Sequence, residues 1–218
     1  MLTPKDAALL RGLPLLREAA PAAVSEAARH CSVVVLKRGE TFAPDGQRRA
    51  WFDVAGLLEL TLNADGGAAM LDVLRPGDVF GCLDSETPPA RPFHVRALGP
   101  ARLIAMPRAD YLRLLRRSPP FARALLAALA DRLSESQSLR ALAAAPARAR
   151  LPRILLWLCD KLGPDIPLTR RALAEAAGVT TETAIRLLSP LEKSGVIRTR
   201  RGVVTVRDAR RLSELALD

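Results

Sequence analysis

The chain has 218 residues, enough for one large domain or two small ones with cores of their own. Its formal net charge is +10, which favours a polyanionic partner. The three cysteines are widely spaced and match no zinc or disulfide pattern, and no apolar run is long enough to cross a membrane. These features argue against a secreted disulfide scaffold and predict a cytoplasmic protein without a membrane partner.

The first 118 residues are expected to form a β domain preceded by short helices. Residues 9–29 are rich in Ala and Leu and are interrupted by Pro14 and Pro21, which predicts short helices there. The next apolar runs have strand length and are separated by Gly, Pro and Asp turn signals: 32–36, 51–54, 57–62, 68–74, 93–98 and 102–106. Short strands with this spacing predict an antiparallel barrel or jelly roll.

Helical periodicity returns after Pro107. Residues 110–116 predict a short helix, and Pro119 can begin a long one because proline is tolerated in a first helical turn. Positions in the long helix alternate in steps of four and three residues, as in the seam of a two-stranded coiled coil: Ala122, Leu126, Leu129, Leu133, Ser136 and Arg140. We therefore expect a homodimer through residues 119–145. The alternative is an amphipathic helix packed on its own barrel.

A hinge is expected over residues 141–149, because this stretch contains Pro146, and a further helix over residues 150–162. Residues 168–206 then predict two helices joined by a tight turn. Thr169 and Thr180 suit the first and second N-caps, and Gly178 can end the first helix in a left-handed conformation. The side chains expected to face the core are Leu173, Ala176, Ala177, Ala184, Leu187, Leu188 and Leu191.

The second of these helices is expected to present Thr181, Glu182, Ile185 and Arg186 outward. Such an arrangement is typical of a helix-turn-helix, whose second helix reads base edges in the major groove. The sequence after it predicts a short hairpin with its turn at Gly202 and with Arg200 and Arg201 near the tip. Guanidinium groups pair well with phosphate, so the hairpin suits a wing that grips the DNA backbone. The chain is therefore expected to bind double-stranded DNA.

A barrel, a long helix and a winged helix-turn-helix, in this order, resemble the Crp/Fnr family of bacterial transcription regulators. The segments that carry the resemblance are LDVLRPGDVFG (71–81), RPFHVRAL (91–98) and RRALAEAAGVTTETAIRLLSPLEKSGVI (170–197). The resemblance implies an α+β fold with a sensor jelly roll over 1–118, a dimerisation helix and hinge over 119–145, and a winged helix-turn-helix over 146–218. It also implies a homodimer whose barrel, on binding an effector, repositions the recognition helices.

The resemblance also assigns DNA-reading roles. Glu182 and Arg186 match the positions that read a TGA-type half-site, and Thr181 stands where the cyclic AMP branch carries a base-reading arginine. Thr169 and Arg170 match phosphate contacts. The full expected set is Thr169, Arg170, Thr180, Thr181, Glu182, Thr183, Arg186, Arg200 and Arg201. The alternative for Glu182 and Arg186 is an i,i+4 surface ion pair. RNA polymerase is an expected partner if the protein activates transcription.

The residues expected at the effector pocket are Gly81, Cys82, Leu83, Arg91, Pro92 and Ser136. In nucleotide-binding members of the family, a glutamate at the position of Cys82 holds the ribose, and a serine at the position of Pro92 helps to hold the phosphate. Neither is present here, which predicts that the barrel does not bind cyclic AMP. Arg91 could still hold another anion, or pair with Asp84 or Glu86.

Other sensing chemistries remain as alternatives. The cysteine cluster of the iron–sulfur branch is absent. Haem is possible through Cys82 or His94, with His30 and Cys31 as further soft or imidazole ligands, although no cofactor is the primary expectation. The other hypotheses for regulation are a redox switch at Cys82 and a dimer that needs no effector. A cupin-type metalloenzyme is the distant alternative, and the two histidines with no HxH spacing argue against it and against any enzyme.

Overall fold

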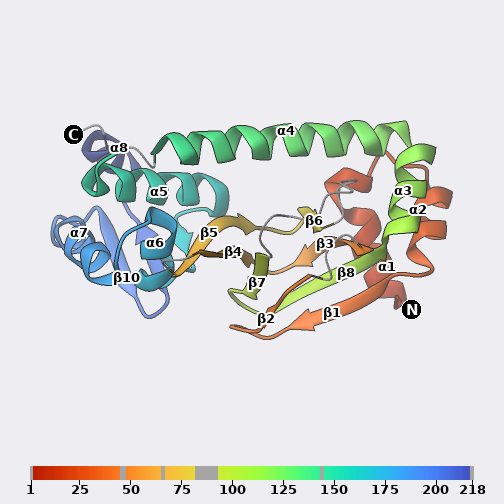
Figure 1. The fold of residues 1–218 in the computed structure, drawn as a ribbon, viewed down its shortest axis with the longest axis horizontal. Helices are drawn as coiled ribbons and strands as arrows, with labels where there is room; N and C mark the ends of the chain where they lie inside the picture. The colour runs from red at the N-terminus through yellow and green to blue at the C-terminus, as the bar shows by residue number, and fades with distance from the viewer. Residues whose placement is uncertain (1, 45–47, 65–66, 82–92, 143–144, 217–218) are drawn as a thin grey trace. The chain divides into compact units, whose positions relative to one another are not determined.

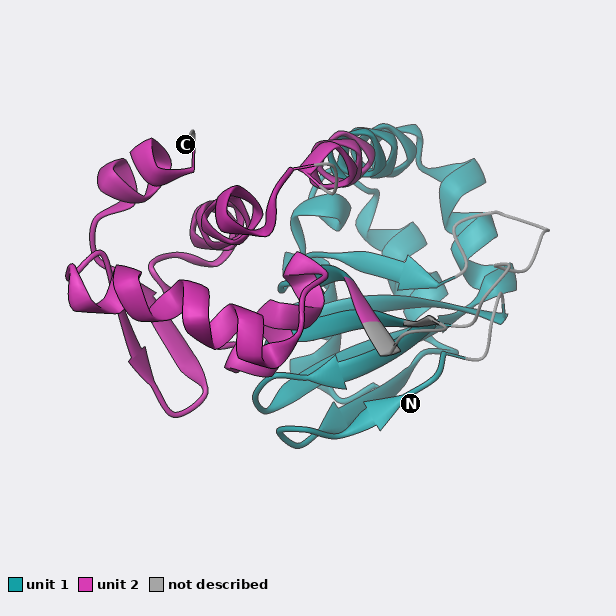
Figure 2. Cartoon of the chain, turned by 60° about the vertical axis from the view of Figure 1, so that its left-hand side comes forward, with its two compact units in different colours: residues 1–67, 71–132 teal, residues 68–70, 133–218 magenta. Residues whose placement is uncertain are grey.

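The structure is a computed structural model that describes residues 2–44, 48–64, 67–81, 93–142 and 145–216 (Figure 1). The chain forms two compact units, residues 1–67 with 71–132 and residues 68–70 with 133–218 (Figure 2). Within the described residues, no helix is long and apolar enough to cross a membrane.

Short helices open the first unit, each of them beginning at a proline. They are α1 (Pro4–Gly12), the 3-10 helix η1 (Pro14–Leu16) and α2 (Pro21–Ala28). Thr3 and Asp6 cap α1 reciprocally, each side chain accepting from the other residue's amide. Short helices were predicted in this region, and α1 begins earlier than the Ala/Leu pattern indicates.

Among the described residues, two four-stranded sheets are ordered β1-β8-β3-β6 and β2-β7-β4-β5, and all of their residues except 68–70 of β5 belong to the first unit. The strands are β1 (Ser32–Leu36), β2 (Thr41–Phe42), β3 (Arg49–Ala55), β4 (Leu58–Ala64), β5 (Gly67–Leu74), β6 (Val79–Gly81), β7 (Phe93–Ala97) and β8 (Ala101–Pro107). The pairs β1–β8, β3–β8, β3–β6, β2–β7 and β4–β7 are antiparallel. The predicted jelly-roll arrangement is confirmed, and β2 and β6 are additions to the predicted strands.

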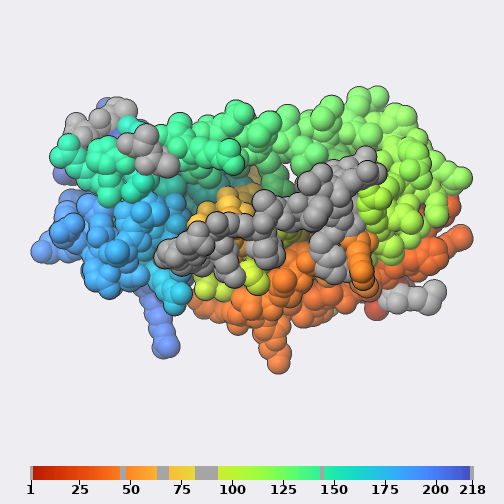
Figure 3. Space-filling view, in the orientation of Figure 1, coloured from red at the N-terminus to blue at the C-terminus, as the bar shows by residue number. Residues whose placement is uncertain are grey.

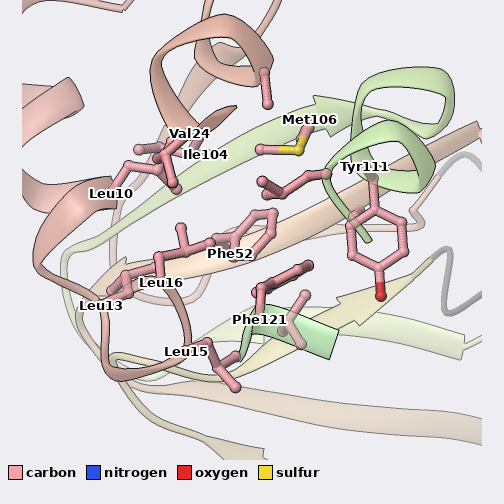
Figure 4. Close-up of a cluster of buried hydrophobic side chains, with 14 of the residues drawn as sticks. Leu10, Leu13, Leu15, Leu16, Val24, Phe52, Ile104, Met106, Tyr111 and Phe121 are labelled. Carbon is pink, nitrogen blue, oxygen red and sulfur yellow. The ribbon is translucent and has the colours of Figure 1, made fainter. Parts of the chain in front are cut away.

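Alternation along β3 places successive side chains in two different cores. Trp51 joins a cluster that contains buried residues of both sheets, among them Leu58 and Leu103. Phe52 instead packs against the helices, together with Tyr111 of α3 (Arg108–Arg117) (Figure 4). One sheet is therefore covered by helices on one face and by the second sheet on the other.

Helix α4 (Pro119–Leu142) begins at the predicted proline. Phe121 and Leu125 are buried in the core of the first unit, whereas Leu126 is 69% exposed and Leu133 is 60% exposed. Figure 3 shows the atoms of this helix, in green, at the surface of the molecule. The helix therefore packs on the barrel by one face and leaves the predicted seam largely uncovered.

The second unit contains α5 (Ala147–Leu162), β9 (Asp165–Ile166), α6 (Arg170–Ala177), α7 (Thr181–Lys193), β10 (Ile197–Arg200), β11 (Val203–Val206) and α8 (Ala209–Leu215). The extent of the predicted hinge is wrong. Helix α4 continues to Leu142, and α5 begins at Ala147 because Pro146 serves as its N-cap. Strand β9 and helix α8 were not predicted. Strand β9 joins the hairpin in a sheet of order β10-β11-β9.

Candidate nucleic-acid interface

The turn between α6 and α7 is built by local capping. The hydroxyl of Thr169 accepts a hydrogen bond of 3.1 Å from the amide of Ala172, as predicted for an N-cap. Gly178 has φ 58° and ψ 44°, and the following amide of Val179 donates to the carbonyl of Ala174 across 3.0 Å. This is a left-handed glycine stop, which turns the chain sharply enough to begin the second helix at once.

Helix α7 is capped by Thr180, whose hydroxyl accepts from the amide of Thr183 across 3.2 Å. Of the predicted core positions, Leu173, Ala177, Ala184, Leu188 and Leu191 are buried, and Ala176 and Leu187 are half-buried. Ala174 is buried beside Leu173, because α6 is covered over a wider face than the pattern indicates. The two helices therefore share one core and leave the opposite side of α7 open.

The open side of α7 carries the predicted base-reading residues. Glu182 and Arg186 are exposed, Ile185 is 44% exposed, and Thr181 is half-exposed. Glu182 and Arg186 form no ion pair with each other or with any other described residue, whereas Arg171 and Glu175 on α6 do form an i,i+4 pair of 2.8 Å. The i,i+4 pair considered for Glu182 and Arg186 is therefore not present. Both side chains are exposed and have no polar partner among the residues that the structure describes.

The predicted wing is the hairpin of β10 and β11, drawn in blue in Figure 1. Arg200 pairs with Val203 at its end, and Gly202 makes the turn with φ +77°. Between the wing and the start of α6 lies a groove of about 450 Å³. Its lining residues are Leu168, Thr169, Arg170, Arg171, Thr199, Arg200, Arg201, Gly202 and Val204. Arginines from both elements line this groove, so it suits an anion such as a phosphate group.

Arg170 is held within this groove. Its Nη2 donates to the hydroxyl of Thr199 across 2.8 Å and lies 3.7 Å from Oε2 of Glu192. Glu192 Oε1 accepts from the Thr199 hydroxyl at 2.6 Å and from the Thr199 amide at 2.9 Å. Both hydrogen bonds from Thr199 hold the pKa of Glu192 below its usual value, and the positive charge of Arg170 adds to this effect.

Sequence reasoning missed Thr199 and Glu192. Thr199 lies between Arg198 and Arg200 in the hairpin, where the sequence predicts roles only for the arginines and the glycine turn. Glu192 lies in the last turn of α7, where a negative charge opposes the helix dipole. This unfavourable position of Glu192 is the signal in the sequence that a hydrogen-bond donor or a positive charge lies close to its carboxylate.

Comparison with known proteins agrees with this architecture. The profile of the cyclic nucleotide-binding domain matches residues 33–118, and that of the Crp-like helix-turn-helix domain matches residues 149–215. The chain is 33% identical over 212 residues to the cyclic AMP receptor protein of Thermus thermophilus, covering 95% of this chain and 98% of the relative. The chain belongs to the Crp/Fnr family of transcription regulators.

Two further members of the Crp/Fnr family show the same relationship. A global nitrogen regulator of Synechococcus elongatus is 30% identical over 185 residues, covering 78% of this chain and 83% of the relative. The crystal structure of a Crp/Fnr-family transcriptional regulator from Thermus thermophilus, 25% identical, superposes with a TM-score of 0.68 over 86% of this chain and 99% of that one. The predicted family and fold class are thus confirmed, and so is the expectation of a DNA-binding helix-turn-helix.

The barrel of this Crp/Fnr regulator is described only in part at the predicted effector pocket. Cys82, Leu83, Arg91 and Pro92 lie outside the described residues, and Ser136 is exposed on α4. Gly81 ends β6 with φ +91°. A Cβ atom added there would lie 2.6 Å from the carbonyl oxygen of Arg49 and 2.8 Å from Cδ1 of Trp51. Gly81 is therefore required by the packing of the strand against β3, whatever its relation to an effector.

The haem candidates of this regulator lie in different settings. Cys31 is buried in the core beneath the helices, and burial, with a smaller effect of Asp110, raises the pKa of its thiol to about 12. The Nδ1 atom of His30 lies 3.1 Å from Oδ2 of Asp110. His94 is half-buried on β7, and Cys82 lies outside the described residues. Cys31 cannot ligate a haem without opening the core. Within the described residues, no cluster of His, Cys, Asp and Glu is arranged to hold a metal ion.

Proposed function

We propose that this regulator binds double-stranded DNA as a homodimer and reads a TGA-type palindromic site with Glu182 and Arg186. The observation that carries the proposal is the exposure of both side chains on the first turns of α7, without an ion pair between them. A carboxylate can accept a hydrogen bond from the N4 amine of cytosine, and a guanidinium can bond to O6 and N7 of guanine together. Their spacing of four residues places them on one face of the helix.

The remaining interface residues suit the DNA backbone. Thr169 and Arg170 lie at the start of α6, and Arg200 and Arg201 lie in the wing across the groove. Thr180 and Thr183 lie at the start of α7, where hydroxyl and amide groups suit phosphate oxygens. Thr181 has no guanidinium to offer, so we expect a relaxed preference at the outermost guanine of each half-site.

The homodimer is proposed to form through residues 119–145. Leu126 and Leu133 lie one heptad apart on α4 and are mostly exposed in a single chain. Two-fold symmetry would then place two copies of α7 about one helical turn of DNA apart. The protein would act in the cytoplasm, where it would contact RNA polymerase if it activates transcription.

The barrel over residues 1–118 is proposed to serve as a sensor that does not bind cyclic AMP. Cys82 stands in place of the ribose-binding glutamate, and Pro92 offers neither a hydroxyl nor an amide donor. The relative from Thermus thermophilus is named a cyclic AMP receptor protein, and that property is its own. An effectorless dimer is the simplest alternative, and a haem or redox sensor requires Cys82 or His94.

The test is selection of binding sites from a random duplex pool with the purified full chain, after its visible spectrum has been recorded. Enrichment of a TGA-containing palindrome without effector would favour a dimer that is already active. Arg186→Ala should then weaken binding by about 1–3 kcal/mol and relax discrimination at one base pair. Arg210→Ala is the matched control, because Arg210 is an exposed arginine of α8 paired with Glu214. An equal loss of affinity for scrambled DNA would mean that Arg186 contacts the DNA backbone rather than a base.

If a folded dimer enriches no sequence, DNA binding requires an effector that is missing from the assay. A Soret band in the spectrum would then show that the sensing group is haem. Calorimetric titration with cyclic AMP directly tests the nucleotide pocket. Heat of binding at micromolar concentration would contradict the inference, drawn from Cys82 and Pro92, that the barrel does not bind cyclic AMP.

A further inference from the structure

The bonds among Arg170, Thr199 and Glu192 join α6 and the wing, which line the groove, to the end of α7. Arg170 belongs to the first turn of α6, Glu192 to the last turn of α7, and Thr199 to the first strand of the wing. The hydroxyl of Thr199 accepts from Arg170 and donates to Glu192, so it is the central member of the network. We call these three residues the wing relay.

The wing relay leaves most of the Arg170 guanidinium available. The group carries five N–H donors, and one of them is used by the Thr199 hydroxyl. The Arg170 side chain is 47% exposed and lines the same groove as Arg200 and Arg201. A guanidinium held in this way can still bond to an anion that enters the groove.

Glu192 joins α7 to the wing through Thr199 and lies near Arg170 of α6. Its carboxylate lies near the C-terminal end of α7, where the helix dipole disfavours a negative charge. Two donors from Thr199 and the nearby charge of Arg170 compensate for this placement. The carboxylate therefore fixes the first strand of the wing against the recognition helix and fixes Arg170 against the wing.

We propose that Thr199 and Glu192 are positioning residues for phosphate recognition, which hold Arg170 and the wing in their DNA-binding arrangement before DNA arrives. The proposal rests on the proposed DNA-binding function. Ordering a long side chain at an interface opposes association, and a side chain that is already ordered avoids that cost when the complex forms. The relay would thus raise affinity for any DNA sequence, because phosphate contacts carry no base information.

The test uses Thr199→Val and Thr199→Ser in the full chain. Valine keeps the shape and the main-chain amide that donates to Glu192, but it removes the hydroxyl, whereas serine keeps the hydroxyl. Dissociation constants are measured on a selected duplex and on a scrambled duplex across a range of salt concentrations. Thr199→Val should weaken binding to both duplexes by about three- to tenfold and reduce the salt slope by up to about 1. Thr199→Ser should bind as the unaltered chain does.

A double-mutant cycle with Arg170→Ala separates positioning from general destabilisation. If the Thr199 hydroxyl acts through Arg170, Thr199→Val should add no loss in the Arg170→Ala background, because the main-chain amide at position 199 still bonds the wing to Glu192. Glu192→Gln is the second variant, because it keeps an oxygen that accepts from Thr199 and loses only the charge that faces Arg170. It should weaken binding less than Thr199→Val does and should leave the helix content by circular dichroism unchanged.

Additive losses in the cycle would overturn the proposal, and so would unchanged or tighter binding by Thr199→Val. Tighter binding would mean that the relay restrains Arg170 from reaching DNA. The proposal for the wing relay is tested by the affinity for the scrambled duplex, because that affinity depends on contacts with phosphate groups and not with bases. Binding by the unaltered chain without any sequence preference would overturn the base-reading roles of Glu182 and Arg186 and would leave this measurement interpretable.

Discussion

Arg132 of α4 donates a hydrogen bond of 2.8 Å to the main-chain carbonyl of Val79 at the start of β6. The same guanidinium lies 3.0 Å from a carboxylate oxygen of Asp72 on β5. The Arg132 and Asp72 side chains are 24% and 13% exposed, so both are partly shielded from water. These contacts fix the proposed dimerisation helix to the strand that ends at Gly81, where the effector pocket is expected.

Arg132→Ala should lower the free energy of unfolding by about 1–3 kcal/mol, because it leaves a shielded carbonyl and a carboxylate without this charged donor. The matched control is Arg123→Ala, since Arg123 is exposed on the same helix and has no polar partner among the described residues. Urea denaturation followed by circular dichroism measures both variants. Equal small losses would show that the Arg132 contacts contribute nothing to stability.

Gly81→Ala should destabilise the barrel for two separable reasons. The positive φ of +91° strains any side chain, and the new Cβ atom would lie 2.6 Å from the Arg49 carbonyl oxygen. Gly39→Ala isolates the first reason, because Gly39 has φ +84° and open space around the added atom. We expect Gly39→Ala to cost about 1 kcal/mol and Gly81→Ala about 1–3 kcal/mol more. Equal melting temperatures of the two variants would contradict the steric argument.

Asp53 is fully buried on β3, and its environment predicts a pH dependence of stability. One of its carboxylate oxygens accepts from the amide of Ala55 at 3.1 Å, and the other has no hydrogen-bond partner in the part of the chain that the structure describes. Burial raises the pKa of Asp53 from 3.8 to about 7. The Ala55 bond opposes this shift, and the negative charge of Asp78 adds to it.

Because the folded pKa of Asp53 lies above the unfolded value, the folded chain retains a proton that the unfolded chain releases between about pH 4 and pH 7. The contribution of Asp53 to stability should therefore fall as the pH rises through that window and then level off. Asp53→Asn should remove this slope and raise the free energy of unfolding at pH 8 by about 2–4 kcal/mol. Asp131→Asn, at an exposed position on α4, is the control. A slope that persists in Asp53→Asn would assign it to another group.

The parts of the fold that depend on local sequence could be predicted. Thr169 and Thr180 cap their helices through bonds to residues three positions later, and Gly178 stops a helix by its own conformation. Such signals are contained within a few residues. Strands β2 and β9 are two residues long, so they carry no periodicity, and only their pairing partners define them as strands.

The parts that depend on distant residues could not be predicted. Glu192 meets Thr199 across a turn and Arg170 across the helix-turn-helix, and no pattern in the sequence states that these three converge. Asp53 likewise meets residues distant in sequence, because its main chain hydrogen-bonds to Gly77 and Asp78 in the turn before β6. Alternation places its side chain on the sheet-facing side of β3, but a carboxylate on that face is usually read as a surface residue.

The exposed face of α4 predicts the oligomeric state. Leu126 and Leu133 are 69% and 60% exposed and lie one heptad apart, so a second copy of α4 could bury both. The helix uses its other face, with Phe121 and Leu125, to pack on the barrel. Dimerisation through Leu126 and Leu133 therefore requires no rearrangement of that core.

Leu126→Lys combined with Leu133→Lys should raise the dimer dissociation constant by on the order of 100-fold or more, because each dimer loses four buried leucines and gains repelling charges. Sedimentation velocity measures the change, and binding to a palindrome should weaken while binding to a half-site stays the same. Val35→Lys is the matched control, since Val35 is 60% exposed on β1, away from α4. A double variant that remains a dimer would show that the chain associates through another surface, and the half-site spacing would then have to be derived from that surface.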